Sequence, residues 1–152
     1  MSLNGRTVVV LAFPDYHELE FWYPVLRARE EDADVRIVAT SVTGVESHLG
    51  YPVIPDAAAA DLAPADIDAV VVPGAVDGLP ELSKPQWDLL RAVAAAGGLV
   101  ASIGTGAKLL EENDLVGGDN VTAQTTDDLP DFFRALTAAV GEASGAGAGK
   151  RG

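Results

Sequence analysis

A sharp turn at Gly104-Thr105-Gly106 is the first place in the sequence where chemistry is expected. The apolar run GGLVASI precedes the turn, and the helix-like AKLLEEN follows it. Many α/β enzymes mount a nucleophilic side chain on such a strand-to-helix turn. Position 104 is glycine, which has no side chain, and the 152-residue chain contains no cysteine. The turn therefore indicates either a site that works without a nucleophile or a site that has lost its chemistry.

Apolar runs alternate with amphipathic segments along the chain, a pattern typical of α/β folds. We expect strands at residues 8–13, 34–40, 68–72, 98–103 and 120–125 and helices at 18–31, 84–96, 106–113 and 128–140. The strands are largely apolar, as strands covered on both faces are. This order predicts an α/β three-layer sandwich with a mostly parallel central sheet, a flavodoxin-like arrangement.

Three parts of the chain fit this pattern less regularly. Pro24 interrupts the first predicted helix and should bend it or restart it. The stretch YPVIP, residues 51–55, is a candidate short strand, and DAAAADLAPAD, residues 56–66, is a loop or a short helix. The Gly/Ala-rich segment 141–152 is expected to be a disordered tail, so that a single domain covers residues 1–140.

Composition narrows the range of partners. Asp and Glu total 23 residues against 10 for Lys and Arg, a formal net charge of −13. This charge argues against nucleic acid and anionic membranes as partners. No apolar run approaches the roughly 20 residues that span a bilayer, and the N-terminal segment lacks the features of a signal peptide. We therefore expect a cytoplasmic protein whose ligand is a small molecule.

Three of the predicted strands end in residues suited to a binding site. Their ends are residues 13–15 (Phe-Pro-Asp), 72–74 (Val-Pro-Gly) and 103–105 (Ile-Gly-Thr). In parallel α/β sheets, ligands bind at the carboxyl ends of the strands. The sequence therefore predicts a pocket at this edge of the sheet. The residues expected at its rim are Asp15, Tyr16 and His17.

The same strand ends resemble those of the ThiJ/PfpI superfamily, which has a class I glutamine amidotransferase-like fold. The family turn reads A-x-I-C-H-G-A-x-L-L, or C-T-G in the branch of isocyanide hydratases, and residues 101–110 read ASIGTGAKLL. Gly104 stands at the position of the nucleophilic cysteine, and Thr105 matches the C-T-G branch. The resemblance covers roughly residues 6–113 and the last helix.

Two further features carry the resemblance, and one departs from it. Glu20, four residues before Pro24, matches the acidic residue of the family's first helix, and residues 73–75 (Pro-Gly-Ala) resemble its P-G-G loop. The segment after residue 113 is shorter than in the family, so we expect a fold that is shortened at its C-terminal side. That shortening would open one side of the pocket or leave a surface for a subunit partner.

The resemblance implies that Glu20 faces the space left by the missing thiol. A carboxyl group placed there can act as general acid/base in isomerisation, hydration, dehydration or ring opening. We therefore expect a cysteine-independent enzyme of specialised metabolism that acts on a small carbonyl-containing metabolite. The family's peptidase, deglycase, glyoxalase and isocyanide hydratase activities depend on the cysteine, so we do not expect them here. The residues expected to bind the substrate are Asp15, His17, Gly74, Ala75, Gly104 and Thr105, with the amides of Ala75 and Thr105 facing a developing oxyanion.

Other interpretations stay open at this point. A non-catalytic ligand-binding or regulatory module is the alternative function, and a purely structural dimer partner is a third. Glu20 is alternatively a solvated helix carboxylate, His17 an exposed loop histidine and Thr105 a helix cap. We do not expect Ser102 to replace the nucleophile, because it lies on a predicted strand and no histidine is near it in sequence. With no cysteine and only two histidines we expect no metal and no cofactor, and the family implies a homodimer formed through the first helix.

Overall fold

The computed structural model describes residues 2–115 and 121–146. Its centre is a five-stranded sheet with the order β2-β1-β5-β6-β7, in which every neighbouring pair is parallel. The strands are β1 (Thr7–Ala12), β2 (Asp34–Ala39), β5 (Ala69–Val72), β6 (Leu99–Ile103) and β7 (Val121–Ala123). The predicted parallel sheet is confirmed, and the short β7 forms its edge next to β6.

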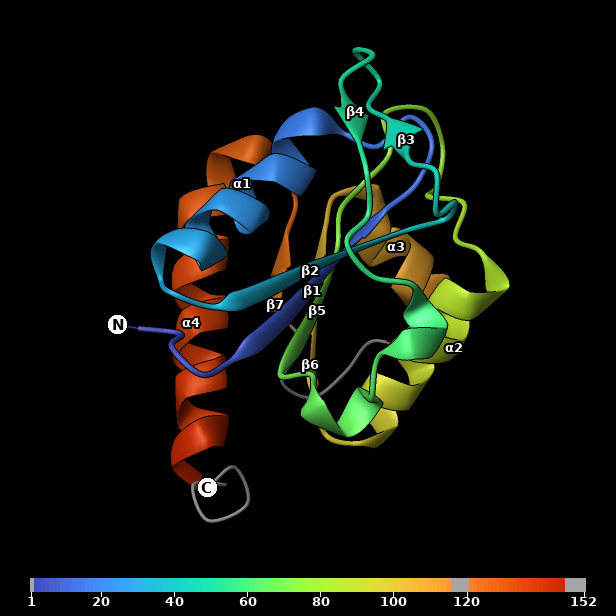
Figure 1. The fold of residues 1–152 in the computed structure, drawn as a ribbon. Coiled ribbons are helices and arrows are strands. Elements are labelled where there is room, and N and C mark those ends of the chain that lie inside the picture. The colour runs from blue at the N-terminus through green and yellow to red at the C-terminus, as the bar shows by residue number, and fades with distance from the viewer. Residues whose placement is uncertain (1, 116–120, 147–152) are drawn as a thin grey trace.

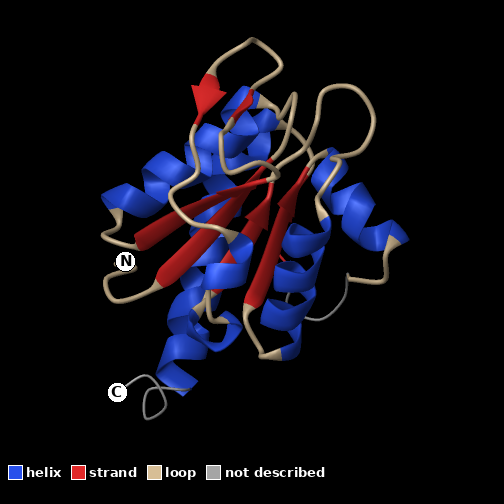
Figure 2. Ribbon diagram, turned by 45° about the vertical axis from the view of Figure 1, so that its right-hand side comes forward, coloured by secondary structure: helices blue, strands red, loops and turns tan. Residues whose placement is uncertain are grey.

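Helices cover both faces of the sheet, which makes the fold a three-layer sandwich (Figures 1 and 2). Helices α1 (Glu18–Glu30) and α4 (Leu129–Ala146) lie on one face, and α2 (Lys84–Ala95) and α3 (Thr105–Glu112) lie on the other. Val8 and Val10 pack with α1 and α4, whereas Val9 and Leu11 pack with α2 and α3. Because successive side chains of a strand point to opposite faces, β1 has to be apolar throughout.

The segment between β2 and β5 holds only short elements. An antiparallel hairpin of β3 (Val45–Glu46) and β4 (Pro52–Val53) projects above the carboxyl ends of the strands (Figure 1). Two single 3₁₀ turns follow, η1 (Ala59–Asp61) and η2 (Pro64–Asp66), and a third, η3 (Thr126–Asp128), precedes α4. The candidate strand in YPVIP and the short helical structure in DAAAADLAPAD are therefore both present.

Two helices differ from the sequence-based expectation. Helix α1 does not restart at Pro24 but continues through it, although proline has no N–H for the carbonyl of Glu20. Pro24 is buried on the side of the helix that packs on the core, which offsets the lost hydrogen bond. Helix α4 extends past the expected boundary at residue 140 to Ala146, so the start of the predicted disordered tail is helical. Residues 147–152 lie outside the described residues.

The strand order reverses direction at one point of the sheet. After β1 the chain crosses to β2 by way of α1, and after β5 it crosses in the opposite direction to β6 by way of α2. The carboxyl ends of β1 and β5 therefore lie at a topological switch point, where ligands bind in open α/β sheets. None of the described helices is long and apolar enough to cross a bilayer.

Candidate functional site

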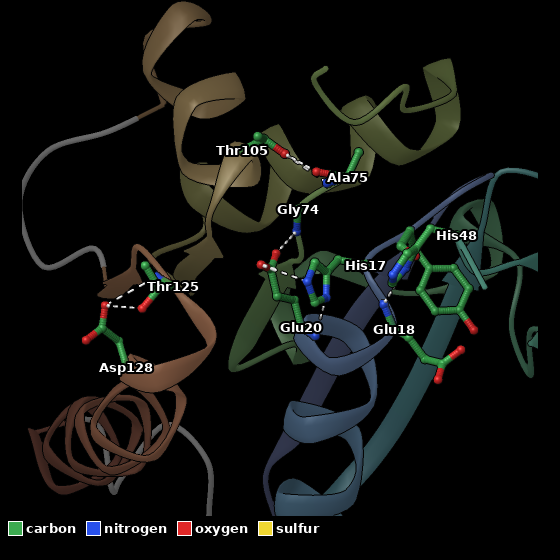
Figure 3. Close-up of polar contacts among 10 residues, drawn as sticks. His17, Glu18, Glu20, His48, Gly74, Ala75, Thr105, Thr125 and Asp128 are labelled. Carbon is green, nitrogen blue, oxygen red and sulfur yellow. Dashed lines mark hydrogen bonds and ion pairs between the residues drawn. The ribbon is translucent and has the colours of Figure 1, made fainter. Parts of the chain in front are cut away.

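Glu20 lies at this switch point, and its side chain is buried against the backbone of Gly74 and Gly104. The residue is 7% exposed, so it is not a solvated helix carboxylate. Its Oε1 accepts a hydrogen bond of 2.8 Å from the backbone N–H of Gly74 (Figure 3). A Cβ placed on Gly104 would lie only 3.1 and 3.2 Å from the two carboxylate oxygens of Glu20. The carboxyl group therefore occupies much of the space beside the position where a nucleophilic side chain would begin.

His17 is the N-cap residue of α1 and lies beside Glu20 (Figure 3). Its Nδ1 accepts the backbone N–H of Glu20 at 3.5 Å, and its Nε2 lies 3.9 Å from Glu20 Oε2. The backbone N–H of His17 donates to the carbonyl of Gly74 at 2.9 Å. This contact and the one from the Gly74 N–H to Glu20 Oε1 thus hold the start of α1 and the loop after β5 together.

His48 was not predicted as a site residue, yet it packs on His17. The two ring centroids are 5.1 Å apart, and His48 Nδ1 accepts the backbone N–H of Glu18 at 3.3 Å. The neighbouring Ser47 donates its hydroxyl to Glu18 Oε1 at 2.7 Å. The hairpin loop is thereby tied to the first turn of α1. Local sequence carries no signal for this contact, because it joins residues that are far apart along the chain.

Glycine is favoured at two positions of the site, for different reasons. Gly104 has φ 56° and ψ −126°, a backbone conformation that residues other than glycine adopt only with strain. Its N–H donates to the carbonyl of Ala123 at 2.8 Å, which holds the turn to β7. At Gly74, a Cβ would lie 2.5 Å from Glu20 Oε1 and 3.0 Å from the amide nitrogen of Thr105. Only glycine lets these three groups approach so closely.

Thr105 and Ala75 hydrogen-bond to each other. The hydroxyl of Thr105 accepts the N–H of Ala75 at 2.8 Å and donates to the Ala75 carbonyl at 3.1 Å (Figure 3). Thr105 is therefore not a side-chain cap of α3, whose N-cap residue is Gly104. The amide of Ala75 is occupied, so the expected oxyanion contact from that amide is not available in this arrangement. The amide of Thr105 is in the first turn of α3, where N–H groups have no intrahelical partner.

The two remaining rim residues differ in their placement. Asp15 is exposed, as expected, and has φ 61° while its N–H donates to the Glu46 carbonyl at 2.9 Å. The expectation that Tyr16 lies at the rim was wrong, because this residue is 0% exposed. Its hydroxyl donates to the Tyr51 carbonyl and accepts from Trp22 Nε1. Burial raises the pKa of the Tyr16 phenol, so the hydroxyl stays protonated and anchors the hairpin to α1.

Two other features bear on the chemistry of the chain. Ser102 is 1% exposed, and among the described residues its Oγ has no hydrogen-bond partner, so it has no base to activate it as a nucleophile.

A depression of about 130 Å³ lies away from the switch point, lined by Arg27, Glu31, Arg134 and Thr137. Both of its arginines are ion-paired with carboxylates, which leaves no net positive charge for an anionic ligand. No group of three potential metal ligands is present in residues 2–115 and 121–146.

A parallel α/β sandwich with a strained turn after β6 and a buried acid on the first helix defines a ThiJ/PfpI-type protein, here without the nucleophile. The chain belongs to the DJ-1/PfpI family, whose model matches residues 6–139. An uncharacterized protein of Archaeoglobus fulgidus is 28% identical, over 82% of this chain and 92% of that protein. Protein dj-1beta of Drosophila melanogaster is 25% identical over 78% of this chain, and the match spans 65% of the fly protein.

Solved structures agree with this fold. The crystal structure of Drosophila melanogaster DJ-1beta has a TM-score of 0.73 at 20% identity, covering 96% of this chain and 97% of that one. A cysteine-to-alanine mutant of a DJ-1 superfamily protein from Salmonella typhimurium has a TM-score of 0.71 at 20% identity, covering 91% and 96%. At these identities the structures support the architecture, and the chemistry has to be argued from the residues of this chain.

Proposed function

We propose that this protein is a cysteine-independent enzyme that performs acid/base chemistry on a small carbonyl-containing molecule, with Glu20 as the general acid/base. The observation that carries the proposal is the unequal environment of the two oxygens of Glu20. Oε1 is held by the Gly74 N–H at 2.8 Å, whereas Oε2 has no hydrogen-bond partner among the described residues. A carboxyl group that is anchored by one oxygen and free at the other can transfer a proton in a defined direction.

The surroundings of Glu20 support proton transfer rather than covalent catalysis. Gly104 offers no atom that could attack a substrate, and the hydroxyl of the adjacent Thr105 is engaged with Ala75. The amide of Thr105 lies at the N-terminus of α3, close to Gly74, where a helix end favours negative charge. This amide can steady an oxyanion that develops when Glu20 takes a proton from a carbonyl compound. Enolisation, isomerisation, hydration, dehydration and ring opening all proceed by such a step.

Replacement of Glu20 by glutamine tests the proposal. The purified protein is incubated with small aldehydes, ketones, hydroxyketones and lactones, and ¹H NMR follows their conversion. Glu20→Gln keeps an oxygen for the Gly74 N–H but cannot exchange a proton, so turnover should fall by at least about 100-fold. Ligand-induced rises in melting temperature should persist. The matched control is Glu18→Gln, since the carboxylate of Glu18 bonds to Ser47, and its turnover should equal that of the wild type.

A non-catalytic binding module is the second candidate, and the glycine at position 104 favours it. This alternative predicts that ligands raise the melting temperature of both the wild type and Glu20→Gln while neither converts any compound. If the wild type converts a compound and Glu20→Gln converts it at the same rate, Glu20 is not the general acid/base, and the enzymatic proposal is contradicted. The two measurements therefore separate an enzyme that uses Glu20 from a protein that only binds.

We also propose that the protein forms a homodimer through α1. Leu19 and Leu26 are 58% and 55% exposed and lie seven residues apart on one side of this helix, with the half-buried Trp22 and Tyr23 between them. An exposed apolar stripe of this kind is typical of an interaction surface. Sedimentation equilibrium should give twice the monomer mass, and Leu19→Glu combined with Leu26→Glu should give the monomer. A monomeric wild type would contradict the dimer.

A cytoplasmic location stays a prediction from the sequence.

A further inference from the structure

The position of the ring proton of His17 is determined by the helix that it caps. Nδ1 accepts the backbone N–H of Glu20 at 3.5 Å and therefore needs a free lone pair. A neutral imidazole that accepts at Nδ1 carries its proton on Nε2. In the neutral ring, this geometry thus places the proton on Nε2, which is then the donor.

That Nε2 faces the free oxygen of Glu20 without bonding to it. The distance of 3.9 Å between Nε2 and Oε2 is too long for a hydrogen bond. The side chain of His17 is 25% exposed and that of Glu20 is 9% exposed, so His17 is the more accessible of the two to solvent. His48 packs on the ring of His17, whose orientation is set by the Glu20 N–H at its Nδ1. The Nε2 donor of His17 and the Oε2 acceptor of Glu20 therefore lie next to each other with no hydrogen bond between them.

We propose that His17 is a second catalytic residue, the donor that polarises a substrate carbonyl while Glu20 removes a proton from the neighbouring carbon. The inference rests on the proposed function and narrows it to the enolisation of carbonyl compounds that carry an α-hydrogen. A neutral imidazole at a helix N-terminus is suited to this task, because it lends a hydrogen bond to an oxyanion. Among such compounds, α-hydroxyketones and α-hydroxyaldehydes would undergo isomerisation.

The enolisation needs no reactant other than the substrate and these two side chains. Glu20 Oε2 takes the α-proton, and the electrons of the C–H bond form a carbon–carbon double bond. The electrons of the carbonyl π bond move to oxygen, which is stabilised by the Nε2–H of His17. Return of the proton from Glu20 to the same carbon regenerates the substrate, with exchange of that hydrogen for solvent. With an α-hydroxy substrate, transfer of the hydroxyl proton to the oxyanion and delivery of the proton of Glu20 to the former carbonyl carbon together give the isomer.

Hydrogen exchange in D₂O tests the role of His17. Hydroxyacetone, dihydroxyacetone and glyceraldehyde serve as probes, and ¹H NMR follows the loss of their α-hydrogen signals. His17→Asn keeps an oxygen to accept the Glu20 N–H, but its shorter side chain cannot place a donor where Nε2 lies, so exchange should fall by about 100-fold, as when an oxyanion donor is lost. His17→Gln, whose longer side chain brings its amide nitrogen nearer that position, should recover part of the rate. His48→Asn should exchange like the wild type.

The outcomes separate this inference from the proposed function. Exchange that requires Glu20 but persists in His17→Asn would overturn the role of His17 alone. If the wild type exchanges none of the three probes, enolisation is overturned, whereas turnover of other carbonyl compounds that depends on Glu20 would leave the proposed function standing. Equal loss in His17→Asn and His48→Asn would mean that the ring pair acts only as packing, which also overturns the inference.

A second readout does not depend on activity. The chain has only two histidines, so His48→Asn in an untagged protein leaves the signals of His17 alone. Long-range ¹H–¹⁵N NMR of the ring at neutral pH should show a protonated Nε2 and an unprotonated Nδ1. The same spectrum of the protein with both His48→Asn and Glu20→Gln should keep this tautomer, because the backbone of α1 imposes it. A proton on Nδ1 would overturn the inference.

Discussion

Gly106→Ala should lower the free energy of unfolding by about 3 kcal/mol, as severe overpacking of a core does. A Cβ at position 106 would collide with the carbonyl oxygen of Val72 and would lie 2.7 Å from that of Pro73. Both atoms are backbone at the end of β5, and Val72 is paired with Ser102 in the sheet. Neither can withdraw without disturbing the strand, so the first turn of α3 would have to move away from the sheet. Urea unfolding followed by circular dichroism measures the loss.

A second glycine provides the control for this prediction. Gly78 has φ 76°, and a Cβ on it would meet no atom within 4 Å. Gly78→Ala should therefore cost only the strain of a left-handed backbone, about 1–2 kcal/mol. The loss at Gly106 should be the larger one, because it comes from contact with backbone. A Gly106→Ala protein that is as stable as the wild type would show that α3 does not dock on β5 as closely as described.

Gln86→Glu should destabilise the protein by about 3–5 kcal/mol, as an uncompensated buried charge does. Gln86 is 0% exposed, and its Nε2 donates to the carbonyls of Ala12 at 2.8 Å and Val38 at 2.9 Å. Its Oε1 accepts the N–H of Ser83 at 2.9 Å, in the capping box of α2. The side chain thus joins α2 to the ends of β1 and β2. A carboxylate in its place would direct negative charge at two carbonyl oxygens.

The pH dependence of this variant distinguishes charge from lost hydrogen bonds. Burial beside two carbonyls disfavours the ionised form, so the pKa of the introduced carboxyl would be higher in the folded state than in the unfolded state. The folded state then binds more protons, and the deficit should shrink as the pH falls from about 8 to about 5. Gln86→Leu should lose about 1–3 kcal/mol at either pH, from the lost hydrogen bonds alone. A Gln86→Glu deficit equal to that of Gln86→Leu at high pH would contradict the prediction.

The predictable part of the fold is the part with the strongest local patterns. The apolar runs at residues 8–13, 68–72 and 98–103 indicated strands covered on both faces, and the structure has β1, β5 and β6 there. Proline at the start of α2 and the periodicity of its apolar residues likewise marked a helix. The fate of Pro24 was harder to predict. Whether a helix continues through a proline depends on what its buried side packs against, which is a property of the whole fold.

The sequence by itself determined the parallel sandwich, the glycine at the turn and the placing of Gly74 and Gly104 at one edge of the sheet, whereas the family resemblance placed Glu20 there. The first three follow from periodicity and from residue types at strand ends, which are local properties. Only the tertiary structure decided that Tyr16 is buried, that Thr105 occupies the Ala75 amide and that His48 packs on His17. Each of these depends on contacts between segments about 30 residues apart or more, or on which way a loop side chain turns. Hydrogen-bond partners at such separations are chosen by the packing of the whole chain, because a polar group that is buried must find a partner wherever the fold supplies one.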